Sequence, residues 1–262
     1  MKHVILGIFL FFIIGCVSTN KNEDGQNMML VESNPVDTLL WISYPIVEEN
    51  TFIKLQMNSE AAYITMADSI IPSMNDSTIA LCVEAAFTGQ LLNEFKSTNI
   101  AGDYVINGIL HKGYECIANT GCLYADRSVY GISSIEHLGE WIEFAQKNNG
   151  TIFQQVLLLK DGKKVYKDFP ITSTSSNIYR SACIMNNGVF AVIQSQKSIP
   201  LNKFIEALLK LGTKDALYLD MGKGWNYGWY RLTMSDNPVT LFDYKSHYQT
   251  NWLVIKGKID NI

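Results

Sequence analysis

The chain has 262 residues, of which 47% are hydrophobic and 18% are charged, a balance typical of a globular protein. Its formal net charge of −4 excludes the class of proteins that bind nucleic acid through a strongly basic face. Its length fits one large domain after a short N-terminal segment, and no internal repeat has the spacing of a solenoid or a propeller.

The chain begins with a pattern typical of a bacterial lipoprotein signal peptide, which we place at residues 1–15. Its apolar run over residues 4–14 is too short for the roughly 20 residues that a membrane-spanning helix needs. The run ends in Ile13-Ile14-Gly15-Cys16, which resembles the lipobox at which such peptides are cleaved. Cleavage there would leave Cys16 carrying acyl chains such as palmitate, and two or more chains anchor a protein stably. The alternative is an ordinary signal peptide followed by an incidental cysteine.

The polar segment after the signal indicates a flexible connection to the membrane. Residues 16–38 comprise the lipidated cysteine and a polar stretch without periodicity, which we interpret as a tether. The expected location is the bacterial cell envelope, either periplasmic or exposed at the surface. Residues 39–262 then form the functional domain.

Most of the domain shows the short apolar runs and turn signals of a β-rich protein. Two hairpins are indicated, one turning at Asp161-Gly162 and one at Asn186-Asn187-Gly188, because these dipeptides suit tight turns. The expected strands cover residues 51–57, 61–66, 78–83, 155–160, 163–167, 180–185 and 189–195.

Two helices interrupt this pattern. The first is expected to begin at Ser133, which forms a capping box with Glu136, and to end near Lys147. The second is expected over residues 200–211, with Gly212 as its stop. The sequence therefore predicts an α+β fold, in which mixed, β-rich sheets with hairpins carry two main helices.

The cysteines of the domain leave two interpretations open. Cys116 and Cys122 flank a turn-like spacer and are the candidate disulfide pair, since export permits disulfides. The alternative is that they are free thiols, together with Cys82 and Cys183. No spacing of Cys and His suggests a metal site, and the acidic loops leave only a structural calcium ion open.

The most informative stretch runs from residue 215 to residue 231. An apolar run over residues 216–219 leads Asp220 into a turn rich in glycine and aromatic residues. Aromatic faces beside one acid and one base suit a sugar ring with a charged substituent. The alternative is a buried turn whose aromatic side chains pack inward. The candidate sugar-binding residues in this turn are Trp225, Asn226, Tyr227 and Trp229.

Three short motifs resemble those of the phosphodiester glycosidase domain family. They are Leu219-Asp220-Met221-Gly222, Arg180-Ser181-Ala182 and Glu84-Ala85-Ala86-Phe87. The run around Asp220 looks most like a gut-bacterial lipoprotein branch of that family. The chain departs from the family pattern at Glu84, where the family has Asn, and at Lys223-Gly224-Trp225, where the family has Gly-Ser-Ser.

The resemblance implies hydrolysis of a sugar-1-phosphodiester at the anomeric carbon without a cofactor. The partner would then be a phosphorylated or phosphodiester-linked glycan. Asp220 is the candidate nucleophile or base and Glu84 its partner carboxyl. Arg180 is the candidate phosphate clamp, because a guanidinium matches phosphate oxygens, and Lys223 could add a second charge.

Five further polar residues at strand ends or in strand-like runs could support such a site or could be ordinary core hydrogen-bonding groups. They are His111, Asn119, Thr120, Gln155 and Asn251. The competing function is a non-catalytic glycan-binding envelope lipoprotein, which would expose an aromatic shelf and leave Glu84 in an ion pair elsewhere. A structural envelope protein is a more distant third interpretation.

Overall fold

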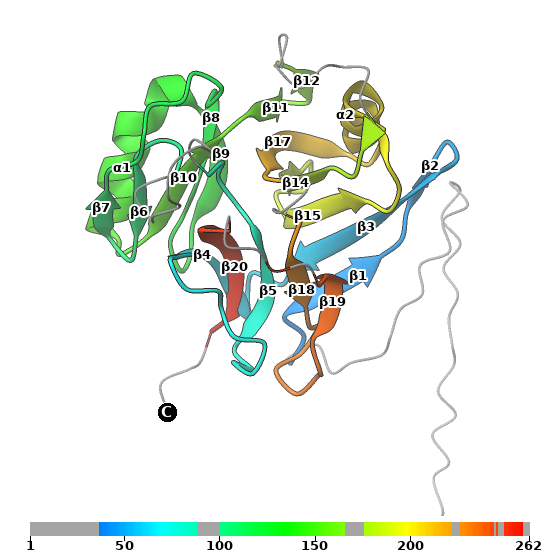
Figure 1. Cartoon of the computed structure of the whole chain (residues 1–262), viewed down its shortest axis with the longest axis horizontal. Helices are drawn as coiled ribbons and strands as arrows, with labels where there is room; N and C mark the ends of the chain where they lie inside the picture. Colours follow the sequence, from blue (N-terminus) through cyan, green and yellow to red (C-terminus); the bar gives the residue numbers. More distant parts are fainter. Residues whose placement is uncertain are drawn as a thin grey trace, which may run out of the picture.

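The computed structural model describes residues 37–88, 100–165, 176–221, 226–243, 245 and 249–258. This part of the chain is mainly β, with two α-helices of ten residues each (Figure 1). The predicted α+β class with mixed sheets is therefore wrong. The strand pairs described are antiparallel, and the two helices lie on the outside of sheets that pack against one another.

The largest sheet has eight strands in the order β1-β3-β15-β14-β17-β11-β12, and β2 pairs with β3 off this path. Its central strands are almost wholly buried, which explains their continuous apolar runs. The strands are β1 (Leu40–Ser43), β2 (Ile46–Val47), β3 (Asn50–Met57), β11 (Leu157–Lys160), β12 (Lys163–Lys164), β14 (Arg180–Met185), β15 (Phe190–Ser195) and β17 (Thr213–Leu219).

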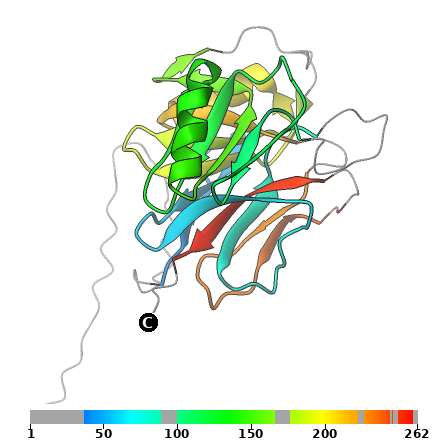
Figure 2. The same ribbon diagram turned by 90° about the vertical axis from the view of Figure 1, so that its left-hand side faces the viewer.

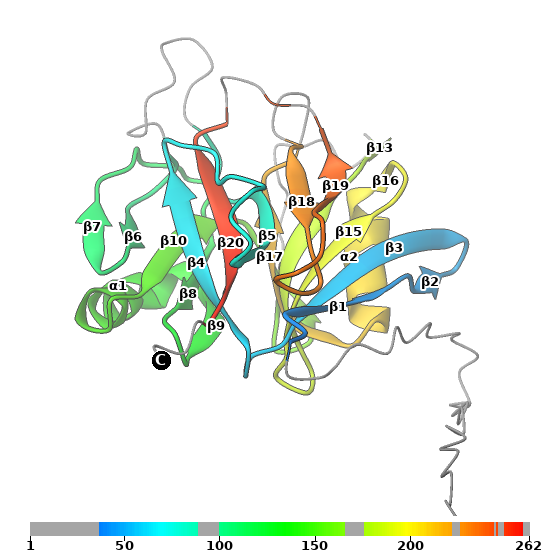
Figure 3. The same ribbon diagram turned by 90° about the horizontal axis from the view of Figure 1, so that it is seen from below.

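A second sheet, in the order β19-β18-β5-β20-β4, packs against the first and lies below it in Figure 1. Its five strands lie side by side in the view from below (Figure 3). They are β4 (Ala62–Asp68), β5 (Ile79–Glu84), β18 (Gly228–Tyr230), β19 (Val239–Phe242) and β20 (Asn251–Gly257).

A third sheet, in the order β7-β6-β10-β8-β9, carries the first helix on its outer side (Figure 2). Its strands are β6 (Tyr104–Ile106), β7 (Ile109–His111), β8 (Gly121–Ala125), β9 (Tyr130–Ser134) and β10 (Thr151–Gln155). A short pair completes the fold, formed by β13 (Ser176–Asn177) and β16 (Ile199–Pro200).

Alternation along β5 shows how the second sheet separates two apolar layers. Leu81 and Val83 point into the core between the two large sheets, where they meet Leu217 and Leu219 of β17. Cys82 points to the opposite face, because successive side chains of a strand alternate. The second sheet is therefore buried on both faces along β5.

The second helix follows the sequence prediction closely. Helix α2 (Leu201–Lys210) has Pro200 as its N-cap, and Gly212 has a φ of +78° just beyond its end. Phe204, Ile205 and Leu208 of this helix pack on the largest sheet. The helix therefore covers the face of the largest sheet that points away from the second sheet.

The first helix begins later than predicted. Ser133 is the fourth residue of β9, and a 3₁₀ turn (Ile135–His137) leads into helix α1 (Leu138–Lys147). Ser134 precedes the turn without a side-chain cap bond, so the expected capping box is not formed. The strand retains Ser133 because this residue pairs with Cys122 of β8.

The two predicted hairpins are confirmed. Strands β11 and β12 pair across Asp161 and Gly162, whose φ values of 49° and 69° fit a type I′ turn. Strands β14 and β15 pair around a turn in which Gly188 has a φ of 81°. The residues that the sequence pattern placed in the two turns are thus the ones that adopt positive φ.

The four cysteines of the domain are free thiols, so the expected Cys116–Cys122 disulfide is not formed. The side chain of Cys122 lies in the apolar layer beneath α1, where its neighbours include Val105 and Ile152. The alternation of side chains along β8 directs the Cys122 thiol into that layer. Cys116 lies half-buried in the loop before β8.

Cys16 and the rest of the proposed signal and tether up to residue 36 lie outside the described residues, so the lipid anchor stays a prediction. Within the part of the chain that the structure describes, neither α-helix has the length and apolar character needed to cross a bilayer.

Candidate functional site

Three residues singled out in the sequence come together at one end of the two large sheets. Glu84 is the last residue of β5, Arg180 is the first of β14, and Asp220 follows β17 directly. Register pairs Arg180 with Leu219, the neighbour of Asp220. The backbone N–H of Asp220 donates to the carbonyl of Ala85 at 3.0 Å, which joins the end of β17 to the residue after Glu84.

The Glu84 carboxyl is fully buried, and neither of its oxygens has a hydrogen-bond partner among the described residues. Burial raises its pKa well above the usual value, and the charge of Asp220 raises it further. Arg180 opposes this shift, as does the Trp252 indole, which faces the carboxyl without reaching hydrogen-bond geometry. Burial therefore favours the protonated form of Glu84.

Asp220 is also buried, but its carboxylate is supported by the backbone. Burial raises its pKa from 3.8 to about 7, and the N–H groups of Met221 and Thr88 partly offset this by donating to it. A carboxyl of that pKa exists in both protonation states at neutral pH. Burial thus raises the pKa of both carboxyls, and the charge of Asp220 adds to the shift at Glu84.

The Arg180 guanidinium is buried and only partly satisfied. Its Nε donates to Oε1 of Gln194 at 2.8 Å and its Nη1 to the carbonyl of Tyr227 at 3.3 Å, while Nη2 has no partner among the described residues. Burial lowers its pKa to about 10. A Cβ at Gly228 would lie 3.1 Å from Nη2, so glycine leaves space there. A buried guanidinium with an unpartnered nitrogen favours an acceptor such as a phosphate oxygen.

Two of the five supporting candidates hold the backbone that follows Glu84. Asn251 accepts the N–H of Ala86 at 2.7 Å and donates to its carbonyl at 3.0 Å. Gln155 donates to the carbonyl of Ala85 at 3.3 Å. Both act as hydrogen-bonding groups that position the backbone directly after Glu84.

The other three candidates lie further along. Thr120 accepts the N–H of Leu157 at 2.9 Å through its hydroxyl. Asn119 donates to the carbonyl of Ala101 at 3.1 Å. His111 lies on the edge strand β7 with its ring stacked on Tyr104 at 4.9 Å, and no contact described for it reaches the three clustered residues.

The aromatic turn differs from the expected exposed shelf. Lys223 and Trp225 lie outside the described residues. Tyr227 and Trp229 are fully buried, and Asn226 is partly buried. These two aromatic rings therefore pack inward, as the alternative interpretation of this turn held.

Sequence reasoning missed Tyr114, which lies in a stretch without any periodic signal. Burial raises its pKa to about 12, with further contributions from Cys116 and from the charge of Asp220. Its own backbone bonds Ile100 and Gly102, at 3.0 and 2.7 Å. The phenol therefore lies within electrostatic range of the Asp220 carboxylate.

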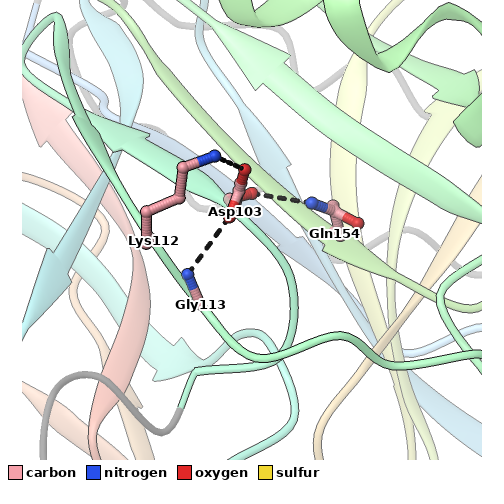
Figure 4. Close-up of polar contacts among 4 residues, drawn as sticks. All are labelled: Asp103, Lys112, Gly113 and Gln154. Carbon is pink, nitrogen blue, oxygen red and sulfur yellow. Dashed lines mark hydrogen bonds and ion pairs between the residues drawn. The ribbon is translucent and has the colours of Figure 1, made fainter.

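A polar clamp fixes the segment before Tyr114 (Figure 4). Asp103 pairs with Lys112 at 2.5 Å and accepts the N–H of Gly113 at 3.3 Å, while its carbonyl accepts from Gln154 at 2.8 Å. A Cβ at Gly113 would lie 2.0 Å from the carbonyl oxygen of Gly102, so only glycine fits.

Within the described ranges, no group of three or more His, Cys, Asp or Glu side chains could hold a metal ion.

The raised pKa values of the two carboxyls predict how stability depends on pH. A folded-state pKa above the unfolded value contributes stability that is fully present below the unfolded pKa and is lost as pH rises. For Asp220 this stability is lost between about pH 4 and pH 7. The loss in the free energy of unfolding is on the order of 4 kcal/mol, since a shift of one pKa unit corresponds to about 1.4 kcal/mol. Chemical denaturation across this range should show falling stability. Glu84→Gln should become more stable relative to wild type as pH rises; a parallel pH profile would contradict the assignment.

Comparison with known proteins identifies structural neighbours of the chain. No family model and no curated protein sequence matches the chain. Among solved structures, it resembles the catalytic domain of zebrafish N-acetylglucosamine-1-phosphodiester alpha-N-acetylglucosaminidase, in a form auto-inhibited by its pro-peptide. That likeness has a TM-score of 0.56 at 11% identity and covers 86% of this chain and 85% of the other.

A hypothetical protein from Synechocystis gives a second likeness, with a TM-score of 0.51 at 12% identity over 84% of this chain and 62% of the other. At such identities, the similarity shows a shared fold alone. The chain thus shares a fold with the catalytic domain of the zebrafish enzyme and with the Synechocystis protein.

Proposed function

We propose that the chain is a hydrolase that cleaves a sugar-1-phosphodiester at the anomeric carbon. The observation that carries the proposal is that two buried carboxyls, Glu84 and Asp220, and the buried Arg180, whose Nη2 has no described partner, lie at neighbouring strand ends, with Asp220 and Arg180 within electrostatic range of Glu84. The zebrafish neighbour supports the same substrate class through its printed name.

The residues divide the reaction as follows. Asp220, ionised in part at neutral pH, attacks the anomeric carbon or guides the water that does so. The departing phosphate monoester has a second pKa near 6, so it needs little help from an acid. Glu84, whose protonated form is favoured by burial, can share its proton with the leaving oxygen without adding a negative charge.

Arg180 supplies the positive charge that a phosphodiester requires. The protonated form of Glu84, which burial favours, does not cancel the charge of the guanidinium, and Nη2 can donate to a phosphate oxygen. The water added across the C1–O bond yields a free sugar and a phosphate monoester. No cofactor enters this scheme.

Two observations favour hydrolysis over simple glycan binding. The Glu84 oxygens have no hydrogen-bond partner among the described residues, whereas the binding alternative expected this residue in an ion pair elsewhere. Tyr227 and Trp229 do not form an exposed shelf. The proposal also includes a lipid anchor at Cys16 and a location in the bacterial cell envelope, which only the lipobox-like motif supports.

The test is a panel of sugar-1-phosphodiesters, each matched with a neutral glycoside of the same sugar. The panel should include N-acetylglucosamine, the sugar in the name of the zebrafish enzyme. We expect free sugar and phosphate monoester from at least one diester and little release from its neutral partner. Binding without cleavage of any diester would support the glycan-binding alternative instead.

A further inference from the structure

Gln194, which no sequence motif indicated, is the direct neighbour of Arg180 in the largest sheet. Strand register pairs these two residues across β14 and β15. Val192, two positions earlier on β15, points into the core between the two large sheets, so Gln194 points there as well because side chains alternate along a strand. The amide of Gln194 and the guanidinium of Arg180 therefore lie buried on the same face.

Strand β15 fixes both the side chain of Arg180 and the backbone just before it. Oε1 of Gln194 accepts a hydrogen bond from Nε of Arg180 at 2.8 Å. The next residue, Ser195, accepts the backbone N–H of Tyr179 through its hydroxyl at 3.0 Å and donates its own N–H to the Tyr179 carbonyl at 3.0 Å. The orientation of the guanidinium is thus set from β15, and Nη2 is the nitrogen that it leaves without a described partner.

The groups around the guanidinium leave its charge uncompensated. Its described acceptors, the Gln194 amide and the Tyr227 carbonyl, are both neutral. The acidic groups in electrostatic range of the guanidinium are Glu84, Cys82 and Tyr218. Burial raises the pKa of each of these three groups well above its usual value, so their neutral forms are favoured. The guanidinium itself, with a pKa of about 10, remains charged at neutral pH.

The residue type at position 194 decides whether this charge stays available. A glutamate there could accept the same hydrogen bond from Nε, and it would also cancel the charge of Arg180. The glutamine amide orients the cation without cancelling it. A buried charge without a counter-charge is costly, so its retention at the strand ends favours a role in binding an anion.

We propose that Gln194 is a positioning residue that makes Arg180 selective for anionic ligands, because it aims the guanidinium through a neutral acceptor. The inference deepens the proposed function and rests on it in taking a phosphate group as the anion. Gln194 acts through Arg180 and is not itself assigned a contact with the substrate.

Two variants separate orientation from charge. Gln194→Met removes the acceptor and keeps a side chain of similar length, whereas Gln194→Glu keeps an acceptor and adds a negative charge. Binding of inorganic phosphate is measured by calorimetry at about pH 8, where a carboxyl beside a guanidinium is ionised. Affinity should fall about 3- to 10-fold in Gln194→Met, the value of one hydrogen bond, and about 10- to 100-fold in Gln194→Glu, the value of one charged hydrogen bond.

Stability should follow the opposite order. Gln194→Met leaves the buried Nε of Arg180 without its acceptor, so this variant should unfold at a lower temperature than Gln194→Glu. A purely structural role for Gln194 predicts the same order in both measurements. Gln56→Glu is the matched control, because Gln56 lies on the adjacent strand β3 opposite Ala191, whose side chain belongs to the layer beneath α2. Its phosphate affinity should stay within about twofold of wild type.

The outcomes separate this inference from the proposed function. Affinity that falls further in Gln194→Met than in Gln194→Glu, equal affinity in wild type and both variants, or a wild type that binds no phosphate would overturn it. Diester cleavage whose Michaelis constant is unchanged in both variants would also overturn it and would leave the hydrolase standing. The expected order of phosphate affinities supports the role of Gln194 even if no diester is cleaved, a result that would overturn the hydrolase alone.

Discussion

Asp220→Asn is expected to lower the turnover of a sugar-1-phosphodiester by about 10²–10⁴-fold, the usual contribution of a positioned proton-transfer group. The substitution is nearly isosteric, and the amide oxygen can still accept from the N–H groups of Met221 and Thr88. The variant should therefore fold. Its stability above pH 7 should exceed that of wild type, because a costly buried charge is removed.

Asp215→Asn is the matched control for this variant. Asp215 is buried on the same strand, β17, but pairs with Lys160 at 3.2 Å and accepts the N–H of Asp161 at 2.8 Å. Its loss should destabilise the hairpin and leave turnover within about twofold of wild type. The mechanism would be eliminated by an Asp220→Asn protein that cleaves the diester as fast as wild type.

The second large effect is expected for Arg180→Lys. The guanidinium satisfies Gln194 and the Tyr227 carbonyl and still has Nη2 free, whereas an ammonium cannot reach all three positions at once. The Michaelis constant for a phosphodiester should rise about 10- to 100-fold, as for the loss of one charged hydrogen bond. The turnover number should change less.

The affinity of Arg180→Lys for a neutral methyl glycoside is the control. It should stay within about twofold of wild type, because that ligand lacks the phosphate that Arg180 is proposed to bind. Arg127→Lys makes the same chemical change at an exposed residue whose described contact is the Tyr63 ring. Steady-state kinetics on the three proteins measures the effect. Equal losses for the diester and the neutral glycoside would indicate a packing role for Arg180 instead.

The strands, the hairpin turns and the second helix were predictable because they depend on local chemistry. Asp161, Gly162 and Gly188 adopt the positive φ values that the turn motifs predicted. The apolar residues that the sequence spacing placed on one face of α2 pack together on the largest sheet. The first helix was misplaced because Ser133 suits both a helix cap and a strand. Pairing with β8, which is a long-range contact, decided for the strand.

The candidate site divides in the same way. The sequence motifs around Glu84, Arg180 and Asp220 identified the charged residues of the candidate site. Sequence alone contains no measure of burial, so it could not distinguish an exposed aromatic shelf from Tyr227 and Trp229 packed inward. Nor could it find Tyr114 or Trp252, which reach the site only through strand pairing and the clamp at Asp103.

The sequence by itself determined the local elements and the chemical types available, because turn conformation, strand alternation and helix spacing depend on neighbouring residues. Only the tertiary structure decided the raised pKa values of the two carboxyls and the unpartnered Nη2 of Arg180. Both arise from burial and from partners nearly 140 positions apart, and desolvation depends on what surrounds a group in space rather than along the chain.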